Sequence, residues 1–289
     1  MPDLTPAEQY NEDGRECADR GDTAGAERAY LAAAALEPEW PAPLYNLGLL
    51  YKYELRWTES LDFNRKALAV DPDHEAALWN RGIAATALAY WTEARECWSK
   101  YGIADPGGPD PPNYRLGRIP VRLDPNGDGE VVWGSRLDPA RVRLTNIPLP
   151  SSEFRFGDIV LNDGAAEGNR TVDGHTYPVF NVLQRLVPST LATFVVELAS
   201  VDDKAIEALE EIAYNMGGAA EHWGNSTYIL CRDCSFGNPH EHSEAAGSPA
   251  HPHCGLAAPS ADVARAILDR WLSSGHIADL VTWYEVEGS

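Results

Sequence analysis

The chain is poor in positive charge. It carries 23 lysine and arginine residues against 44 aspartate and glutamate residues, which gives a formal net charge of −21. Proteins hold nucleic acids and anionic membranes through clustered lysine and arginine side chains, so we expect neither as a partner. The acidity favours solubility first, and a basic partner or a cationic ligand second.

The chain also lacks any apolar run of about 18 residues, so the sequence predicts no transmembrane helix. Residues 1–14 are polar and acidic, without the basic and apolar segments of a secretory signal. The five cysteines are an odd number, which argues against a disulfide framework. These absences predict a cytoplasmic protein whose thiols stay reduced.

Catalytic motifs are missing as well. The sequence contains no G-x-S-x-G nucleophile motif, no G-x-x-x-x-G-K phosphate-binding loop and no G-x-G-x-x-G dinucleotide motif. His175 and His222 are isolated along the chain, and we expect both to be structural. The sequence therefore indicates no reaction, and it leaves open whether the protein is an enzyme.

What the sequence does contain is a repeat of 34 residues. The recurring positions are Gly14, Gly48 and Gly82, then Ala26, Ser60 and Ala94, then Pro38, Pro72 and Pro106. A glycine and a small residue at fixed offsets let two helices approach closely, and a proline ends the second helix because it has no amide donor. The pattern predicts three helical hairpins.

This period and these offsets resemble the tetratricopeptide repeat (TPR) over residues 8–106. The resemblance implies an all-α array at residues 1–106 that leans on the next domain as its cap. Some positions depart from the family pattern. Asn64 replaces a large apolar residue, and Asp13 and Arg81 occupy a usually apolar site.

In this family the first helices of the hairpins line a groove for an extended segment of another protein. The resemblance therefore implies a protein or peptide partner, with Asn46 and Asn80 at the position that bonds the backbone of a bound peptide. The residues expected to line the groove are Tyr45, Asn46, Leu49, Lys52, Trp79, Asn80 and Ile83. Packing of Tyr45 and Trp79 against neighbouring helices is the alternative.

Proline and glycine in residues 107–117 predict a linker. Residues 118–188 then change to short runs rich in β-branched and aromatic residues, separated by turn signals such as Asn162-Asp163-Gly164 and Asp173-Gly174. This pattern predicts a small antiparallel β-barrel or sheet. Nine arginines between Arg115 and Arg185 indicate an anion site or a dock for an acidic neighbour, and the neighbour is favoured because both flanking regions are acidic.

Residues 189–289 alternate strand-like and helix-like patterns. Strands are predicted at 190–200, 221–231, 254–260 and 278–287, with helices at 201–218 and 260–275. This β-α-β-β-α-β order resembles the ferredoxin-like split βαβ fold, an α+β architecture. Many ligand-binding and protein-binding domains share that fold, so the resemblance carries no function.

An insert at residues 231–254 holds three cysteines and four histidines. Two of its cysteines form a C-x-x-C motif after a predicted strand, as in half of a zinc knuckle, and thiolates with imidazoles suit tetrahedral zinc. The preferred ligand set closes the shortest loop and consists of Cys231, Cys234, His240 and His242. The alternates are Cys254, His251 and His253.

Three other interpretations of the insert remain open: a disordered solvated loop, a redox site and coincidence. A redox motif needs a helix that starts at the cysteines and lowers their pKa, and the S-F-G-N-P run at 235–239 does not favour one. Four protein ligands close a zinc site, so a structural role is favoured over a catalytic one.

The patterns together predict a multi-domain interaction protein: TPR helices, a small β domain, and a ferredoxin-like domain at 189–289 with a structural Zn²⁺ site. It would act as an adaptor for a partner protein or peptide. The alternative is a metal-dependent enzyme or small-molecule-binding protein with a pocket between the repeat groove and the C-terminal domains. There, Trp79, Trp91 or Tyr45 and a rim of carboxylates would hold a small cation.

Overall fold

The computed structural model describes residues 4–125, 129–172, 174–226, 228–229, 253–275 and 278–286. The chain divides into two compact units. Unit 1 comprises Met1–Tyr114 with Asp138–Ala140, and unit 2 comprises Arg115–Leu137 with Arg141–Ser289. None of the helices in the described ranges combines the length and the apolar character needed to cross a membrane.

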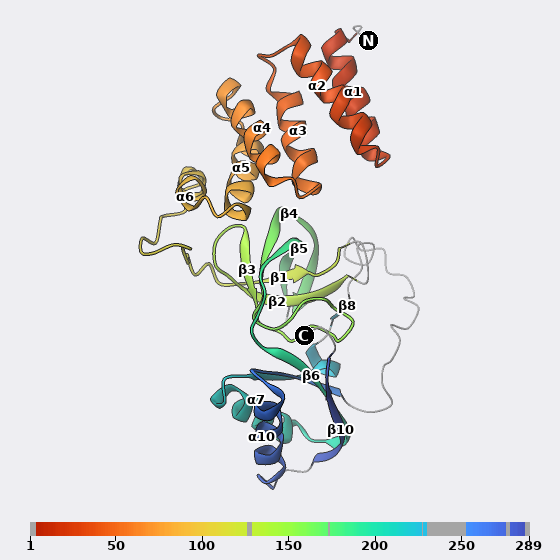
Figure 1. Cartoon of the computed structure of the whole chain (residues 1–289), viewed down its shortest axis with the longest axis vertical. Helices are drawn as coiled ribbons and strands as arrows, with labels where there is room; N and C mark the ends of the chain where they lie inside the picture. The colour runs from red at the N-terminus through yellow and green to blue at the C-terminus, as the bar shows by residue number, and fades with distance from the viewer. Residues whose placement is uncertain are drawn as a thin grey trace. The chain divides into compact units, whose positions relative to one another are not determined.

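Unit 1 consists of helical hairpins, as the 34-residue period predicts (Figure 1). Its described residues form α1 (Pro6–Asp19), α2 (Thr23–Leu36), α3 (Pro41–Tyr53), α4 (Trp57–Val70), α5 (Glu75–Ala87) and α6 (Trp91–Lys100). The second helices of the hairpins begin at Thr23, Trp57 and Trp91, each one repeat after the last. The predicted helical repeats are therefore confirmed.

Local sequence signals set the helix ends. Thr5 and Glu8 form a capping box at the start of α1, and Pro6 occupies its first turn. Helix α6 ends at Lys100, six residues before the Pro106 expected to close the third repeat. Gly102 follows with a φ of 74°, a left-handed conformation that glycine adopts without strain. Residues 103–117 form no helix or strand.

The repeated glycines bring the two helices of each hairpin into close contact. A Cβ atom placed on Gly14 would lie 2.6 Å from the Tyr30 ring, and one on Gly82 would lie 2.4 Å from the Trp98 ring. Gly48 faces Asn64 in the same way, at 2.5 Å from Nδ2. Any side chain at these positions would force the helices apart. The sequence interpretation of the glycines is thus confirmed.

Asn64 is polar where the repeat pattern has a large apolar residue, and the structure shows what holds it. Its side chain is fully buried between α3 and α4. Asn64 Nδ2 donates a hydrogen bond to the Ser60 carbonyl at 2.8 Å, and Ser60 Oγ donates to the Gly48 carbonyl at 2.8 Å. Asn64 Oδ1 has no hydrogen-bond partner among the described residues.

Unit 2 begins with a strand-rich barrel. Its strands are β1 (Arg118–Arg122), β2 (Glu130–Arg136), β3 (Arg141–Leu144), β4 (Ile159–Val172) and β5 (His175–Val187). The sheet order runs β1-β5-β4-β3-β2, and the additional β1–β2 pairing closes the ring. Its interior holds Val121, Leu123, Val132, Val142, Leu144, Val160 and Val182.

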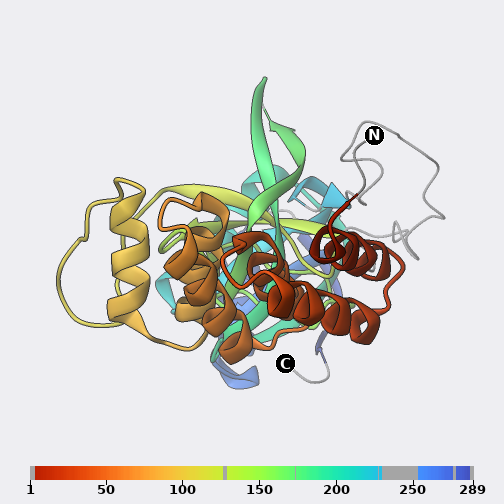
Figure 2. The same cartoon turned by 90° about the horizontal axis from the view of Figure 1, so that it is seen from above.

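Two details of this barrel differ from the prediction. The β1–β5 pairing is parallel, at Val121 opposite Phe180, in a sheet expected to be antiparallel. The turn predicted at Asn162-Asp163-Gly164 lies inside the continuous strand β4. There, Asp163 Oδ1 accepts a hydrogen bond from Gly164 N, and the pairing with β5 is locally irregular. As a result β4 and β5 form one long ribbon that stands out from the barrel (Figure 2).

A second sheet completes unit 2. It contains β6 (Ala192–Val201), β7 (Ala219–His222), β9 (His253–Ala258) and β10 (Ala278–Glu285) in the order β10-β6-β9-β7, with every pairing antiparallel. Helices α7 (Asp203–Asn215) and α10 (Ala261–Leu272) pack on one face of it. Trp271 anchors α10 there, because its Nε1 donates to the Ala205 carbonyl at 2.7 Å.

The strand predicted at 221–231 is broken in the structure. After β7 the chain forms the short helix α8 (Trp223–Ser226) and then β8 (Tyr228–Ile229), which pairs with β2 in the barrel sheet. The break occurs at Trp223, whose buried ring donates a hydrogen bond from Nε1 to the Ile147 carbonyl at 2.8 Å. The described strands on either side of the insert therefore belong to different sheets.

Two acidic side chains bind backbone and side-chain amides of residues 146–149, in the loop that follows β3. Glu221 on β7 accepts hydrogen bonds from Ile147 N at 2.6 Å and from the Asn146 side chain. Glu130 on β2 accepts one from Leu149 N at 3.1 Å. Burial raises the pKa of Glu130 to about 7, against the Leu149 hydrogen bond and with a further contribution from the Glu221 charge.

Candidate partner-binding groove and pocket

The predicted groove residues lie on two helices, α3 and α5, and polar contacts connect these helices to each other and to α1. Asn46 Nδ2 donates a hydrogen bond to Asn11 Oδ1 at 2.9 Å, which joins α3 to α1. Lys52 Nζ donates to Asn80 Oδ1 at 3.4 Å, which joins α3 to α5. The first helices of the three hairpins thus share one line of polar contacts, and the two predicted asparagines stand on it.

Exposure divides the predicted groove residues into two groups. Lys52, Asn80 and Ile83 are buried, and Ile83 is fully so. Asn46 and Leu49 are half-buried and keep accessible surface. A segment lying along α3 would therefore reach Asn46 and Leu49 first.

The two predicted groove aromatics make ring contacts within unit 1. Tyr45 lies against the His74 ring at a centroid distance of 4.8 Å. Trp79 contacts Trp98 and Tyr101 edge-on at 5.2 and 4.8 Å. These contacts favour packing over ligand contact, at Trp79 above all, because its ring is held from two sides.

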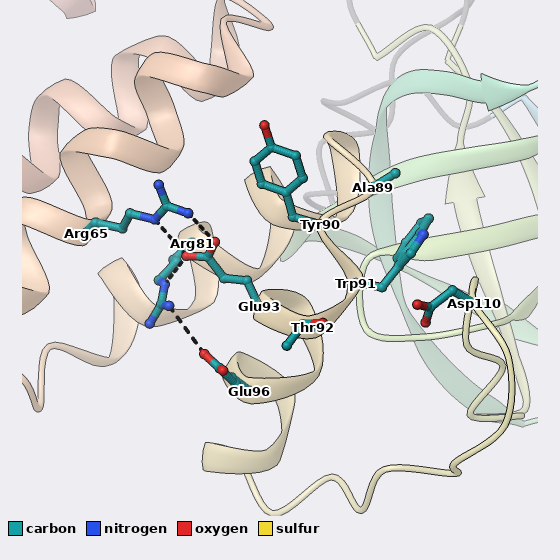
Figure 3. A pocket seen from close by; sticks show the side chains of 9 residues that line it. All are labelled: Arg65, Arg81, Ala89, Tyr90, Trp91, Thr92, Glu93, Glu96 and Asp110. Carbon is teal, nitrogen blue, oxygen red and sulfur yellow. Dashed lines mark hydrogen bonds and ion pairs between the residues drawn. The ribbon is translucent and has the colours of Figure 1, made fainter.

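A separate pocket of about 540 Å³ lies in unit 1 around the start of α6 (Figure 3). It is lined by Arg65, Arg81, Ala89, Tyr90, Trp91, Thr92, Glu93, Glu96 and Asp110. None of the seven predicted groove residues is among them. The sequence predicts Trp91 in a cleft between the groove and the C-terminal domains, whereas this pocket, which Trp91 lines with Glu96 and Asp110, is formed by residues of unit 1 alone.

One carboxylate organises the basic side of the pocket. Glu93 Oε1 accepts hydrogen bonds from Arg65 Nε at 2.8 Å and from Arg81 Nε at 2.6 Å. Although burial opposes it, these two guanidinium groups hold the pKa of Glu93 below its usual range. The contact also explains why Arg81 stands at a usually apolar repeat position, since its charge is paired on the next helix.

The pocket also carries exposed acidic and aromatic groups. The Glu96 side chain is 62% exposed, and one of its oxygens lies 3.6 Å from Arg81. Asp110 is 50% exposed, and its Oδ1 accepts a hydrogen bond from Arg95 at 3.0 Å. Tyr90 is 52% exposed. Asp110 is thus held in place by an arginine that does not line the pocket.

Most of the predicted zinc ligands lie outside the described residues: Cys231, Cys234, His240, His242 and His251. The two that are described, His253 and Cys254, begin strand β9. Across the residues that the structure describes, no group of three or more His, Cys, Asp or Glu side chains has the arrangement of a metal site. The preferred ligand set therefore stays a prediction.

Cys254 points into the core of the second sheet. It is fully buried among apolar residues that include Val196 and Leu209. Burial raises the pKa of its thiol to about 12, so the thiol stays protonated at neutral pH. Its burial among apolar side chains, away from solvent, is typical of a core cysteine.

His253 has a different setting. It is half-buried and stands opposite Glu197 on β6, with its side chain on the sheet face away from the Cys254 thiol. The two neighbouring alternates therefore point to opposite sides of the sheet.

No protein-family model and no curated protein matches the chain. Among solved structures, the TPR2B domain of yeast Sti1 in its pHsp70 complex is 22% identical, with 32% of this chain and 75% of that chain covered and a TM-score of 0.31. The second TPR of Spaghetti (RPAP3) with the HSP90 peptide SRMEEVD is 20% identical, covers 33% and 88%, and has a TM-score of 0.32. The Sgt2 TPR domain from Aspergillus fumigatus is 22% identical, covers 37% and 72%, and has a TM-score of 0.32.

These likenesses are confined to about a third of the chain and have low TM-scores. The TPR-like organisation of unit 1 therefore rests on features of the chain itself. These are the 34-residue step between its helices and the glycine contacts inside each hairpin.

Proposed function

We propose that unit 1 binds an extended segment of a partner protein along its first helices, α1, α3 and α5. The observation that carries the proposal is the pair Asn46 and Asn80. They stand one repeat apart on successive first helices, and each is fixed by a side chain of a neighbouring helix. Binding of the HSP90 peptide belongs to the Spaghetti domain, and the proposal for this chain stands on its own residues.

The side-chain amides of Asn46 and Asn80 each keep a polar group that can bind a peptide backbone, an acceptor on the first and a donor on the second. Asn46 uses one N–H of its amide to reach Asn11, so its Oδ1 is left to accept from a peptide N–H. Asn80 is buried and uses Oδ1 to accept from Lys52, so a segment that reaches it meets Nδ2, which is left to donate to a peptide carbonyl. Side chains held in one orientation bind with less loss of conformational freedom. This arrangement suits an extended segment of any sequence, with Leu49 as an apolar contact.

Binding by the full-length chain tests this function. A random dodecapeptide library is panned against the protein, and the selected peptide is titrated against Asn46→Ala, Asn80→Ala and the double variant. Loss of one hydrogen bond in each single variant weakens binding roughly five- to tenfold. Asn169→Ala, an exposed asparagine on β4, is the matched control and leaves the affinity unchanged. Equal affinity of the double variant and the wild type would refute the groove.

We infer that the second sheet of unit 2 with α7 and α10 is a ferredoxin-like split βαβ domain. The strand order β10-β6-β9-β7 supports this, because it places the first strand of the domain beside the last and the third. The helices after β6 and β9 pack on the same sheet face, which is the second supporting feature. An experimental structure with one of these helices on the opposite face would refute the assignment.

We propose further that Zn²⁺ is held by Cys231, Cys234, His240 and His242 in a structural site. The placement of Cys254 in an apolar core favours this set over one that uses Cys254. Elemental mass spectrometry of the purified chain tests it: about one zinc per chain is expected, and none in Cys231→Ser/Cys234→Ser. Equal zinc content in both proteins would refute the set.

A further inference from the structure

The pocket at the start of α6 has a chemistry that the groove does not use. Its volume of about 540 Å³ lies inside the ordinary range of ligand pockets, roughly 300–1,000 Å³. It shares no residue with the predicted groove, and all its lining residues belong to unit 1. A ligand held there would therefore contact none of the predicted groove residues.

The two arginines that line the pocket are already paired with a carboxylate. Arg65 and Arg81 both donate to Glu93, and the side chains of Arg81 and Glu93 keep little exposed surface. An anionic ligand would have to compete with Glu93 for both guanidinium groups. The Arg–Glu–Arg group therefore acts as a rigid floor rather than as an anion receptor, as Figure 3 shows with its dashed lines.

Two carboxylates of the pocket, Asp110 and Glu96, have fewer contacts than Glu93. Arg95 contacts only Oδ1 of Asp110, so Oδ2 has no partner among the described residues. Arg81 contacts one oxygen of Glu96 at 3.6 Å, which is beyond hydrogen-bond distance. Because the described residues leave one oxygen of each carboxylate without a partner, both can accept from a cationic ligand.

Two aromatic side chains also line the pocket. Trp91 and Asp110 lie side by side in Figure 3, and Tyr90, which is more than half exposed, stands between Arg81 and Trp91 in that view. Ammonium and guanidinium groups bind the faces of tryptophan and tyrosine rings, and their alkyl stems bury against them. The lining as a whole carries two positive and three negative side chains, on a chain of net charge −21.

We propose that this pocket binds two neighbouring arginine or lysine side chains of a basic peptide segment. One side chain places its charged head at Asp110 with its stem along Trp91, and the other reaches Glu96 on the opposite side of the pocket, past Tyr90. The site goes beyond the groove function, since it selects a basic residue through its side chain whereas the groove holds a backbone.

Titration of the full-length protein with two capped hexapeptides tests the proposal. The probes are acetyl-GSRRSG-amide and its acidic counterpart acetyl-GSEESG-amide, each with a fluorescent label, in salt of roughly 0.15 M to screen long-range attraction. The expected result is saturable binding of the basic peptide alone. Glu96→Gln and Tyr90→Ala each weaken it roughly three- to tenfold, as loss of one charge or ring contact predicts.

A charge-matched control separates the pocket from general acidity. Asp62→Asn removes one exposed carboxylate of α4, 53% exposed and outside the pocket lining, and leaves binding unchanged. Equal weakening by Asp62→Asn and Glu96→Gln would overturn the proposal, because the attraction would then be diffuse. Preferential binding of the acidic peptide, or no saturable binding of either peptide, would overturn it as well.

The two functions of unit 1 are distinguished by crossing the experiments. Asn46→Ala/Asn80→Ala retains basic-peptide binding if the pocket acts alone, and Glu96→Gln retains the affinity of the panned dodecapeptide. Loss of hexapeptide binding in the asparagine variant would place that binding in the groove and refute the pocket. Thermal melting of each variant confirms that it is folded.

Discussion

Gly48 on α3 and Asn64 on α4 approach so closely that no methyl group fits between them. A Cβ atom on Gly48 would lie 2.5 Å from Asn64 Nδ2 and 2.8 Å from Cγ. The buried Asn64 amide is fixed to the Ser60 carbonyl and has little freedom to retreat. Substitutions at Gly48 and Asn64 therefore show how much the close approach of α3 and α4 contributes to the stability of unit 1.

Gly48→Ala is expected to lower the stability of unit 1. Overpacking costs about 1–3 kcal/mol, against a gain of about 1 kcal/mol from the better helix propensity of alanine. Urea denaturation followed by circular dichroism at the helical signal measures the difference. Asn64→Ala in the same chain makes room, so the double variant is less destabilised than the two single effects predict. Additive effects would contradict the contact.

Glu130→Gln tests the raised pKa of a buried carboxyl. The pKa of about 7 in the folded state is above the value near 4.5 in the unfolded chain, so the folded state holds a costly ionised group at high pH. The stability of the wild type therefore rises as the pH falls from about 8 to about 5 through this group. Glutamine can still accept from Leu149 N and carries no charge. The variant is expected to be more stable at pH 8 by up to about 3 kcal/mol, and the difference disappears near pH 5.

Denaturant titrations across this pH range, on wild type and variant in parallel, measure that difference. Glu153→Gln, an exposed glutamate of the same unit, is the control and leaves the pH profile unchanged. A difference between Glu130→Gln and wild type that is the same at pH 5 and pH 8 would show that Glu130 titrates normally.

Glu93→Gln tests the Arg65–Glu93–Arg81 ion pairs, whose stabilising effect depends on pH in the opposite direction to that of Glu130. The pKa of Glu93 is held below its usual range, so its ion pairs stabilise the fold above a pH of about 4.5 and lose their effect as the pH falls below it. The variant is expected to be less stable by about 1 kcal/mol at neutral pH, and equal to the wild type in acid. Glu96→Gln, whose carboxylate is mostly exposed, changes stability little. A loss that persists unchanged at pH 3 would point to packing instead of charge.

Cys254→Ala and Cys254→Ser separate a core residue from a metal ligand. Both are expected to keep the full zinc content, because Cys254 lies in the apolar core as a protonated thiol. Cys254→Ser buries a hydroxyl group in apolar surroundings and costs about 1–3 kcal/mol, while Cys254→Ala costs less. Elemental mass spectrometry and thermal melting measure the two effects. Loss of zinc in either variant would make Cys254 a ligand.

The helices of unit 1 could be predicted from the sequence because each hairpin repeats the same local rules. Gly14, Gly48 and Gly82 marked the close approaches correctly. The partner of Asn46 was not predictable, since Asn11 stands one position off the repeat and its contact depends on the angle between α1 and α3. The pocket was missed for a similar reason, because Arg65, Arg81 and Glu93 meet only when three helices are packed.

In unit 2 the strands could be predicted, but not all of their ends or partners. Val172 at the end of β4 pairs with His175 at the start of β5, while Asp173 of the expected turn lies outside the described residues. Asn162-Asp163-Gly164 forms an irregularity instead of a turn, because the pairing with β5 continues past it. The change of sheet at Trp223 depends on a hydrogen bond to Ile147, which is 76 residues away in the sequence. No local pattern contains that information.

The insert between β8 and β9 affects how fast the second sheet of unit 2 can fold. Sheet pairings such as Val196 with Cys254 form only after the chain has closed a loop that contains the whole insert. Pairings between distant residues are slow to form, and each doubling of a loop costs about 0.6 kcal/mol of closure entropy. Zinc bound inside the insert would shorten the free part of this loop before the sheet assembles. Metal loading would then appear in the refolding rate of unit 2, and a chelator added during refolding would slow the chain even where it leaves the folded protein intact.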